Sequence, residues 1–205
     1  MRELVILVHG LGRTPASMWA LELEACRRGY EVVNWHYRSR RDAIAEHAAR
    51  LGRELGPRMQ RAAHVHFVTH SLGGIVVREF LSSHELPNLG RVVMLAPPNG
   101  GSEIADRVTR SPLASRLAGK PVRELTTARQ SPAVRFAVGV IAGSRKHLPL
   151  RWIEGASDGV VAVERTKLDG MRDFLVLRRT HTFLPWSRDA IAQTFAFLER
   201  ERFTR

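Results

Sequence analysis

Short apolar runs alternate with amphipathic stretches from one end of the 205-residue chain to the other. Such runs, bounded by turn residues and separated by segments of helical spacing, are typical of buried parallel strands covered by helices. Strands are predicted at residues 4–8, 31–35, 65–69, 91–95, 136–142 and 174–177. The pattern therefore predicts an α/β fold, with a six-stranded parallel sheet and helices on both faces, in a single domain spanning residues 1–205.

The first predicted helix follows Thr14-Pro15, which supplies a cap and a first-turn proline. Trp19, Leu23 and Cys26 fall on one face of this helix, so Cys26 is expected in the core. Cys26 is the single cysteine of the chain, which excludes an internal disulfide.

Two later helices are also marked by their ends. One is expected from Arg40 to Leu55, stopping at Gly56-Pro57. The last is expected after Ser187 as its cap, with apolar residues recurring on one face at Ile191, Phe195 and Leu198.

The chain is strongly basic, with 32 basic residues against 20 acidic ones and a net charge of +12. Residues 107–151 contain ten basic residues and one acid, Glu124, so the positive charge is local. An arginine-rich composition is the simple alternative to a functional basic surface. No basic-aromatic nucleic-acid motif occurs, so no nucleic-acid partner is expected. The apolar run Leu4–Val8 is too short for a signal-peptide core, which makes a cytoplasmic protein the expectation.

The segment Thr69-His70-Ser71-Leu72-Gly73-Gly74 joins a predicted buried strand to a predicted helix. A serine at such a sharp turn projects its hydroxyl above the carboxyl edge of the sheet, where the helix N-terminus favours negative charge. The motif is a variant of Gly-x-Ser-x-Gly with Thr69 in place of the first glycine. The alternative interpretation of this segment is an ordinary capped strand-to-helix turn without a catalytic serine.

Three further segments supply the partners that a nucleophilic Ser71 would need. His9-Gly10-Leu11-Gly12 offers an oxyanion loop, with the backbone N–H groups of Leu11 and Leu72 as the expected donors. Asp158 lies in a turn and is followed by a glycine that frees the backbone to aim the carboxylate. His181 lies in a loop just before the last helix. The chain order Ser, Asp, His is the order found in α/β hydrolases.

Other residues compete for two of these roles. Asp169 and Asp173 are alternatives to Asp158, but both occupy ordinary solvated positions in the predicted pattern. His70 is an alternative to His181, yet a neighbour of the nucleophile in so sharp a turn is expected to point away from it. His64 and His66 share one face of a strand, where a metal pair is less expected than satisfied strand histidines. His9 is expected to order the oxyanion loop.

The chain resembles small bacterial lipases and esterases of the α/β-hydrolase superfamily. The resemblance is carried by Val8-His9-Gly10, His70 to Gly74, Ala96 to Ser102, Ser157 to Val161, and His181. It implies a minimal version of the fold that lacks the first two antiparallel strands, because here the oxyanion loop follows the first strand. It also implies loops or small helices over the active site.

The chemistry of these residues predicts a hydrolase of carboxylic esters. Ser71 is expected to attack the ester carbonyl, His181 to move the proton, and Asp158 to hold the imidazole. The substrate is expected to be a small-molecule or lipid ester, and neither a metal nor an organic cofactor is needed. Acyl transfer, thioester cleavage and amide cleavage use the same triad and stay open. A more remote alternative is a non-catalytic, basic surface-binding protein on a hydrolase scaffold.

Residues 97–132 are expected to form a short lid-like insertion over the Ser71 pocket. The segment is amphipathic and basic, so contact with an anionic membrane surface is one hypothesis and a solvated arginine-rich face is the other. Met18, Trp19 and Phe183 are candidates for lining an acyl pocket, although core packing is the simpler role for each.

Overall fold

The protein is represented by a computed structural model that describes residues 2–128, 133–146 and 153–204. Six strands form one parallel sheet in the order β2-β1-β3-β4-β5-β6. The strands are β1 (Leu4–Val8), β2 (Glu31–Trp35), β3 (Val65–His70), β4 (Leu89–Leu95), β5 (Val138–Gly143) and β6 (Asp173–Leu177). The predicted six-stranded parallel sheet is confirmed, and every predicted strand is present with small shifts at its ends.

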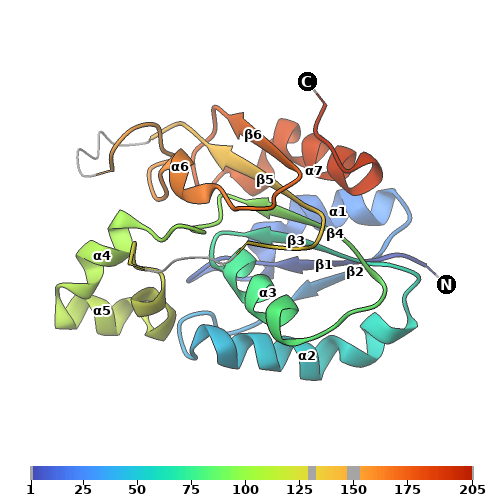
Figure 1. The fold of residues 1–205 in the computed structure, drawn as a ribbon, viewed down its shortest axis with the longest axis horizontal. Coiled ribbons are helices and arrows are strands. Elements are labelled where there is room, and N and C mark those ends of the chain that lie inside the picture. Colours follow the sequence, from blue (N-terminus) through green and yellow to red (C-terminus); the bar gives the residue numbers. More distant parts are fainter. Residues whose placement is uncertain (1, 129–132, 147–152, 205) are drawn as a thin grey trace.

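Both faces of the sheet are buried beneath helices (Figure 1). One face is covered by α2 (Ile44–Arg61) and α3 (Leu72–Ser83), the other by α1 (Trp19–Arg27) and α7 (Arg188–Arg200). Along β1, Leu4, Ile6 and Val8 belong to the first core cluster, whereas Val5 and Leu7 belong to the second. All five are fully buried, which is why this strand is a continuous apolar run instead of an alternating one.

A group of short helices, here called the cap, lies beyond the carboxyl ends of the strands (Figure 1). The cap consists of α4 (Glu103–Thr109), α5 (Pro112–Ala118) and the 3-10 helix η2 (Lys120–Glu124). The other short elements are η1 (Pro15–Met18), α6 (Val163–Thr166) and η3 (Leu184–Trp186). The cap falls within the lid-like insertion expected at residues 97–132. The end of that insertion, residues 129–132, and the end of the basic run at Arg151 lie outside the described residues.

The buried face of α1 is not the one predicted. Leu21 and Ala25 are buried on this helix, together with Met18 just before it. Trp19 is 54% exposed, and Cys26 is exposed instead of lying in the core. Both sets of residues recur at helical spacing, so periodicity alone did not decide which face the sheet covers.

The ends of two helices also differ from the prediction. α2 begins at Ile44 instead of Arg40 and continues through Pro57 to Arg61, because its apolar face extends to the buried Met59. Burial of that last turn outweighs the hydrogen bond that the proline removes. Ser187 does precede α7, but its hydroxyl donates to the carbonyl of Leu184 (2.8 Å) and makes no capping bond. No helix in the described part of the chain is long and apolar enough to span a bilayer.

Candidate active site

Ser71 sits at a strained turn between β3 and α3. Its backbone has φ 52° and ψ −123°, a conformation that costs a non-glycine residue about 1–3 kcal/mol and is concentrated at functional sites. The Ser71 N–H donates to the carbonyl of Leu95 (2.9 Å), which ties the turn to the end of β4. Ser71 is therefore held at the carboxyl edge of the sheet, directly before the first turn of α3.

Two glycines explain how α3 packs so closely beneath this turn. A Cβ atom on Gly73 would lie 2.3 Å from the carbonyl oxygen of Val8, so only glycine lets α3 approach the end of β1. A Cβ on Gly74 would lie 3.2 Å from Oγ1 of Thr69. Thr69 is fully buried, and its hydroxyl points toward the carbonyl of Val93 (3.4 Å). Because Gly74 has no side chain, there is room for Thr69 at the position that is usually glycine.

Gly73→Ala is expected to destabilise the protein by about 3 kcal/mol, because the new methyl group would overlap backbone atoms that have no rotamer to change. Urea unfolding of the variant measures this loss. Gly56→Ala on α2 is the matched control, since a Cβ there meets no atom within 4 Å apart from its chain neighbours and the backbone of its own helix. It is expected to change the free energy of unfolding by no more than about 1 kcal/mol. Equal stability of the two variants would contradict the close approach at Gly73.

His181 and Asp158 form a buried, hydrogen-bonded pair. Nδ1–H of His181 donates to Oδ2 of Asp158 (2.7 Å), and the His181 N–H donates to the Asp158 carbonyl (3.1 Å). The other carboxylate oxygen accepts from the N–H groups of Val160 (2.9 Å) and Val161 (2.8 Å). Gly159 has φ 96°, which is the backbone freedom expected of it. In the neutral imidazole this bond places the proton on Nδ1 and leaves the lone pair on Nε2.

His70 contacts the backbone of His181 and lines the same pocket as Ser71. Its Nε2–H donates to the His181 carbonyl (3.0 Å), and the two ring centroids are 4.7 Å apart. Burial, with the nearby His181, holds the pKa of His70 well below its usual value, so this ring stays neutral. His70 is therefore a positioning residue for the His181 loop, and its Nε2 is already engaged.

Four buried histidines make the fold sensitive to acid. Burial lowers the pKa of His9, His47, His66 and His70, so below about pH 6.5 the unfolded chain takes up protons that the folded chain resists. The free energy of unfolding is expected to have its highest values above pH 6.5 and to fall by about 2–4 kcal/mol between pH 6.5 and 5.5. Urea unfolding at a series of pH values measures this. A stability that is flat down to pH 5 would contradict the burial of these rings.

The loop after β1 is anchored by two side chains from the segment that follows β2. The hydroxyl of Tyr37 donates to the carbonyl of His9 (2.7 Å), and burial raises the pKa of Tyr37, so the phenol stays protonated. The Gly12 N–H donates to Oγ of Ser39 (2.9 Å). His9 is fully buried, stacks on Tyr37 with centroids 4.5 Å apart, and donates from Nδ1 to the Gly10 carbonyl (3.0 Å). These contacts agree with the expectation that His9 orders this loop.

The two expected oxyanion donors belong to segments that adjoin Ser71. Leu72 is the first residue of α3, so its N–H has no acceptor within the helix. The Leu11 N–H belongs to the turn closed by the bond from the Arg13 N–H to the Gly10 carbonyl (3.2 Å), which does not use it. A Cβ on Gly10 would lie 3.1 Å from Cβ of Ser71, so the loop rests directly against the serine.

Ser71 and His181 open into one pocket of about 220 Å³. The cap supplies one wall through the apolar side chains of Ile104, Ala105 and Val122, and Leu125, directly after η2, adds to this wall. Pro98, Val160 and Val161 add to the apolar lining. The pocket combines a serine hydroxyl and an imidazole with a mostly apolar chamber, and ligand sites usually have such a few polar groups in an apolar lining.

The three side chains expected to line an acyl pocket are elsewhere. Met18 is fully buried in the core, on the face of the sheet covered by α1 and α7. Trp19 and Phe183 are 54% and 57% exposed, and neither lines the Ser71 pocket. Side chains of the cap line the Ser71 pocket instead. The amphipathic sequence pattern of the cap could have indicated these pocket-lining residues. It could not have separated them from Leu113 and Leu117, which belong to the same pattern and are each 69% exposed.

His70, which was expected to point away from Ser71, lines this pocket, whereas the competing acids and His66 lie away from it. Asp173 accepts from the N–H groups of Phe174 (2.8 Å) and Phe203 (2.7 Å). Asp169 is exposed. His66 is buried and accepts from the Arg91 N–H (2.9 Å). Within the described residues, no group of three or more His, Cys, Asp or Glu side chains has a metal-binding arrangement.

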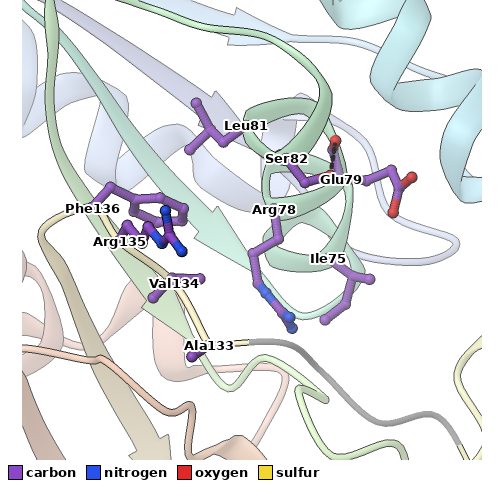
Figure 2. A pocket seen from close by; sticks show the side chains of 9 residues that line it. All are labelled: Ile75, Arg78, Glu79, Leu81, Ser82, Ala133, Val134, Arg135 and Phe136. Atoms are coloured by element: carbon purple, nitrogen blue, oxygen red, sulfur yellow. Dashed lines mark hydrogen bonds between the residues drawn. The ribbon is translucent and has the colours of Figure 1, made fainter.

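A second cavity, of about 290 Å³, lies between α3 and residues 133–136, and it contains neither Ser71 nor His181 (Figure 2). Arg78 extends into it from α3. This guanidinium donates to Oδ1 of Asn99 (2.9 Å), and the Asn99 amide donates to the Thr166 carbonyl (2.8 Å). These two hydrogen bonds hold the segment between β4 and the cap beside the Ser71 turn.

The parallel sheet and its strand-turn-helix at Ser71 are those of an α/β-hydrolase fold. The chain belongs to the family described as a domain of unknown function, DUF7379, which matches residues 1–167. The matched region includes Ser71 and Asp158, and His181 lies beyond it. No curated protein matches the sequence significantly.

Solved structures share this fold at low sequence identity. The mature form of a Bacillus licheniformis lipase has a TM-score of 0.79 and 19% identity, over 98% of this chain and 92% of that one. An esterase from Exiguobacterium antarcticum has a TM-score of 0.68 and 12% identity, over 96% and 92%. A Legionella pneumophila phospholipase has a TM-score of 0.64 and 19% identity, over 88% of this chain and 53% of that one. The expected resemblance to lipases and esterases is thus confirmed at the level of the fold.

Proposed function

We propose that the protein is a serine hydrolase that cleaves carboxylic esters through a triad of Ser71, His181 and Asp158. The observation that carries the proposal is the buried His181–Asp158 hydrogen bond of 2.7 Å, because His181 lines the same pocket as the strained Ser71. An activated serine needs a base, and the base needs a partner that fixes its tautomer. The structural relatives include a lipase and an esterase, which supports the same class of reaction.

The reaction would proceed in two halves. Oγ of Ser71 attacks the ester carbonyl carbon while its proton passes to Nε2 of His181. The tetrahedral oxyanion accepts hydrogen bonds from the N–H groups of Leu11 and Leu72, and the alcohol leaves with the proton from His181. Water then gives a proton to His181 and attacks the acyl-enzyme, which releases the carboxylic acid and restores Ser71. Asp158 stabilises the imidazolium in both halves.

The substrate would place its acyl chain against the apolar cap side chains. A pocket of about 220 Å³ is small, which favours short acyl chains over long ones. Hydrolysis of p-nitrophenyl esters across acyl lengths tests this, with a fluorophosphonate as a parallel covalent label. Turnover that peaks at short chains supports the proposal. Labelling without ester turnover would favour the thioesterase, amidase or acyltransferase alternatives, and absence of both signals from folded protein would contradict a serine hydrolase.

The cap offers a second proposal, that it contacts anionic lipid surfaces. Leu113 and Leu117 on α5 are each 69% exposed, four residues apart, with the exposed Arg110 and Arg116 nearby in the chain. Exposed apolar side chains among cations are typical of interfacial segments. Sedimentation with anionic vesicles at low salt is expected to exceed that with neutral vesicles, and Leu113→Ser/Leu117→Ser is expected to weaken it severalfold. Equal binding to both vesicle types would contradict it.

A further inference from the structure

A basic groove of about 390 Å³ lies beside the oxyanion loop. Its lining includes five exposed arginines, Arg13, Arg38, Arg40, Arg41 and Arg116, and we call it the arginine groove. No Asp or Glu among the described residues lines it. Guanidinium groups gathered in a shallow, open site without carboxylates favour a phosphate or carboxylate ligand, which they bind with paired N–H donors.

The backbone fixes these charges relative to Ser71. After β2, Tyr37 and Ser39 are buried and bond to the oxyanion loop, while the alternate residues Arg38 and Arg40 are exposed. This alternation turns the arginines outward from the same segment that anchors the loop. Because β2 and β1 are neighbours in the sheet, the groove lies at its carboxyl edge, next to the loop that begins at His9.

The arginine groove adjoins the Ser71 pocket, with Arg13 between them. Arg13 lines both, and its Nη2 donates to Oγ1 of Thr182 (2.8 Å), the residue after His181. The guanidinium of Arg40 packs on Gly12, where a Cβ would lie 2.8 Å from Nη2. A substrate that extends from Ser71 past Arg13 therefore meets the other arginines directly.

We propose that the arginine groove binds an anionic group, phosphate or carboxylate, on the alcohol portion of the ester that Ser71 attacks. The proposal rests on the proposed hydrolase function and names its substrate class. The acyl chain occupies the apolar chamber under the cap, so the alcohol portion extends past Arg13 into the groove. The ligand is a substituent of a single substrate molecule, held by charge-assisted hydrogen bonds. Leu117 of α5 also lines the groove, so the two proposals differ in their ligand: a single anionic substituent in the groove, and an anionic vesicle surface against the cap.

A matched pair of esters tests the proposal. The probes are p-nitrophenyl butyrate, which is neutral, and 3-carboxy-4-nitrophenyl butyrate, which carries a carboxylate on the leaving group. The ratio of their kcat/KM values cancels any general loss of activity. Arg38→Gln/Arg40→Gln is expected to lower the anionic-to-neutral ratio about tenfold, mainly through KM. High salt is expected to lower the wild-type ratio in the same direction.

The control variant is Arg53→Gln/Arg61→Gln, which removes two charges from exposed positions of α2. Its ratio is expected to stay within about twofold of the wild type. A ratio in Arg38→Gln/Arg40→Gln equal to that of this control would overturn the proposal while leaving the hydrolase intact.

Calorimetric titration with inorganic phosphate gives a readout that needs no catalysis. Wild type is expected to bind phosphate at low salt, and Arg38→Gln/Arg40→Gln to lose this binding while the control keeps it. If neither ester is hydrolysed but phosphate binding follows this pattern, the anion site stands and the proposed function fails. Binding to anionic vesicles alone, with no response to phosphate or to the anionic ester, would overturn the proposal in favour of a lipid surface.

Discussion

Ser71→Ala is expected to lower the turnover of p-nitrophenyl butyrate by a factor on the order of 10⁶, to near the background rate. Without Oγ no acyl-enzyme forms, and the residual rate acceleration comes from the oxyanion donors and from substrate binding. The fold is expected to survive, because alanine at φ 52° meets the same backbone strain that serine already bears.

The control for this variant is Ser82→Ala, an exposed serine on the same helix, which is expected to retain full turnover. Steady-state rates and urea unfolding of both variants separate loss of chemistry from loss of structure. Retention of more than a few per cent of activity by folded Ser71→Ala would contradict the assignment of the nucleophile.

Asp158→Asn is expected to lower turnover about 10⁴-fold with little change in the fold. Oδ1 of Asp158 accepts two backbone N–H groups, so an asparagine must place its carbonyl oxygen there and turn its NH₂ toward Nδ1 of His181. Nδ1 would then become an acceptor and Nε2 would carry the proton. In this tautomer His181 has no lone pair on Nε2 with which to take the proton of Ser71.

Asp169→Asn is the matched control for the acid, because Asp169 is the exposed aspartate that the sequence offers as an alternative. It is expected to keep turnover within about twofold of the wild type. Turnover numbers for the two variants, measured at the same pH, give the comparison. Equal losses in the two variants, or an unimpaired Asp158→Asn, would show that the acid has been placed wrongly.

The sheet and the triad candidates were predictable because each has a local signal. Buried parallel strands are continuous apolar runs, as in Leu4–Val8, and the turn at Ser71 needs small residues that stand at fixed offsets, such as Gly73. Asp158 and His181 follow strands at the same edge of the sheet, so their meeting follows from a parallel topology. The structure brings these two into a 2.7 Å hydrogen bond.

The buried face of α1, the lining of the Ser71 pocket and the arginine groove depend on tertiary packing, which the sequence pattern does not determine. Periodicity marks two possible faces on α1, and packing against the sheet buries Leu21 instead of Cys26. Likewise the cap turns Val122 into the Ser71 pocket and leaves Leu117 exposed. To predict the arginine groove from the sequence, one must know that β2 lies beside β1 in the sheet. The prediction of individual strands does not supply this neighbour relation.

The central claim is that Ser71 is an activated nucleophile, and one measurement tests it directly. The intact protein is reacted with a fluorophosphonate, digested, and analysed by peptide mass spectrometry. The account predicts a single covalent adduct on the peptide that contains Ser71, at a rate that falls sharply in Asp158→Asn. An adduct on another residue, or no adduct on correctly folded protein, would contradict it.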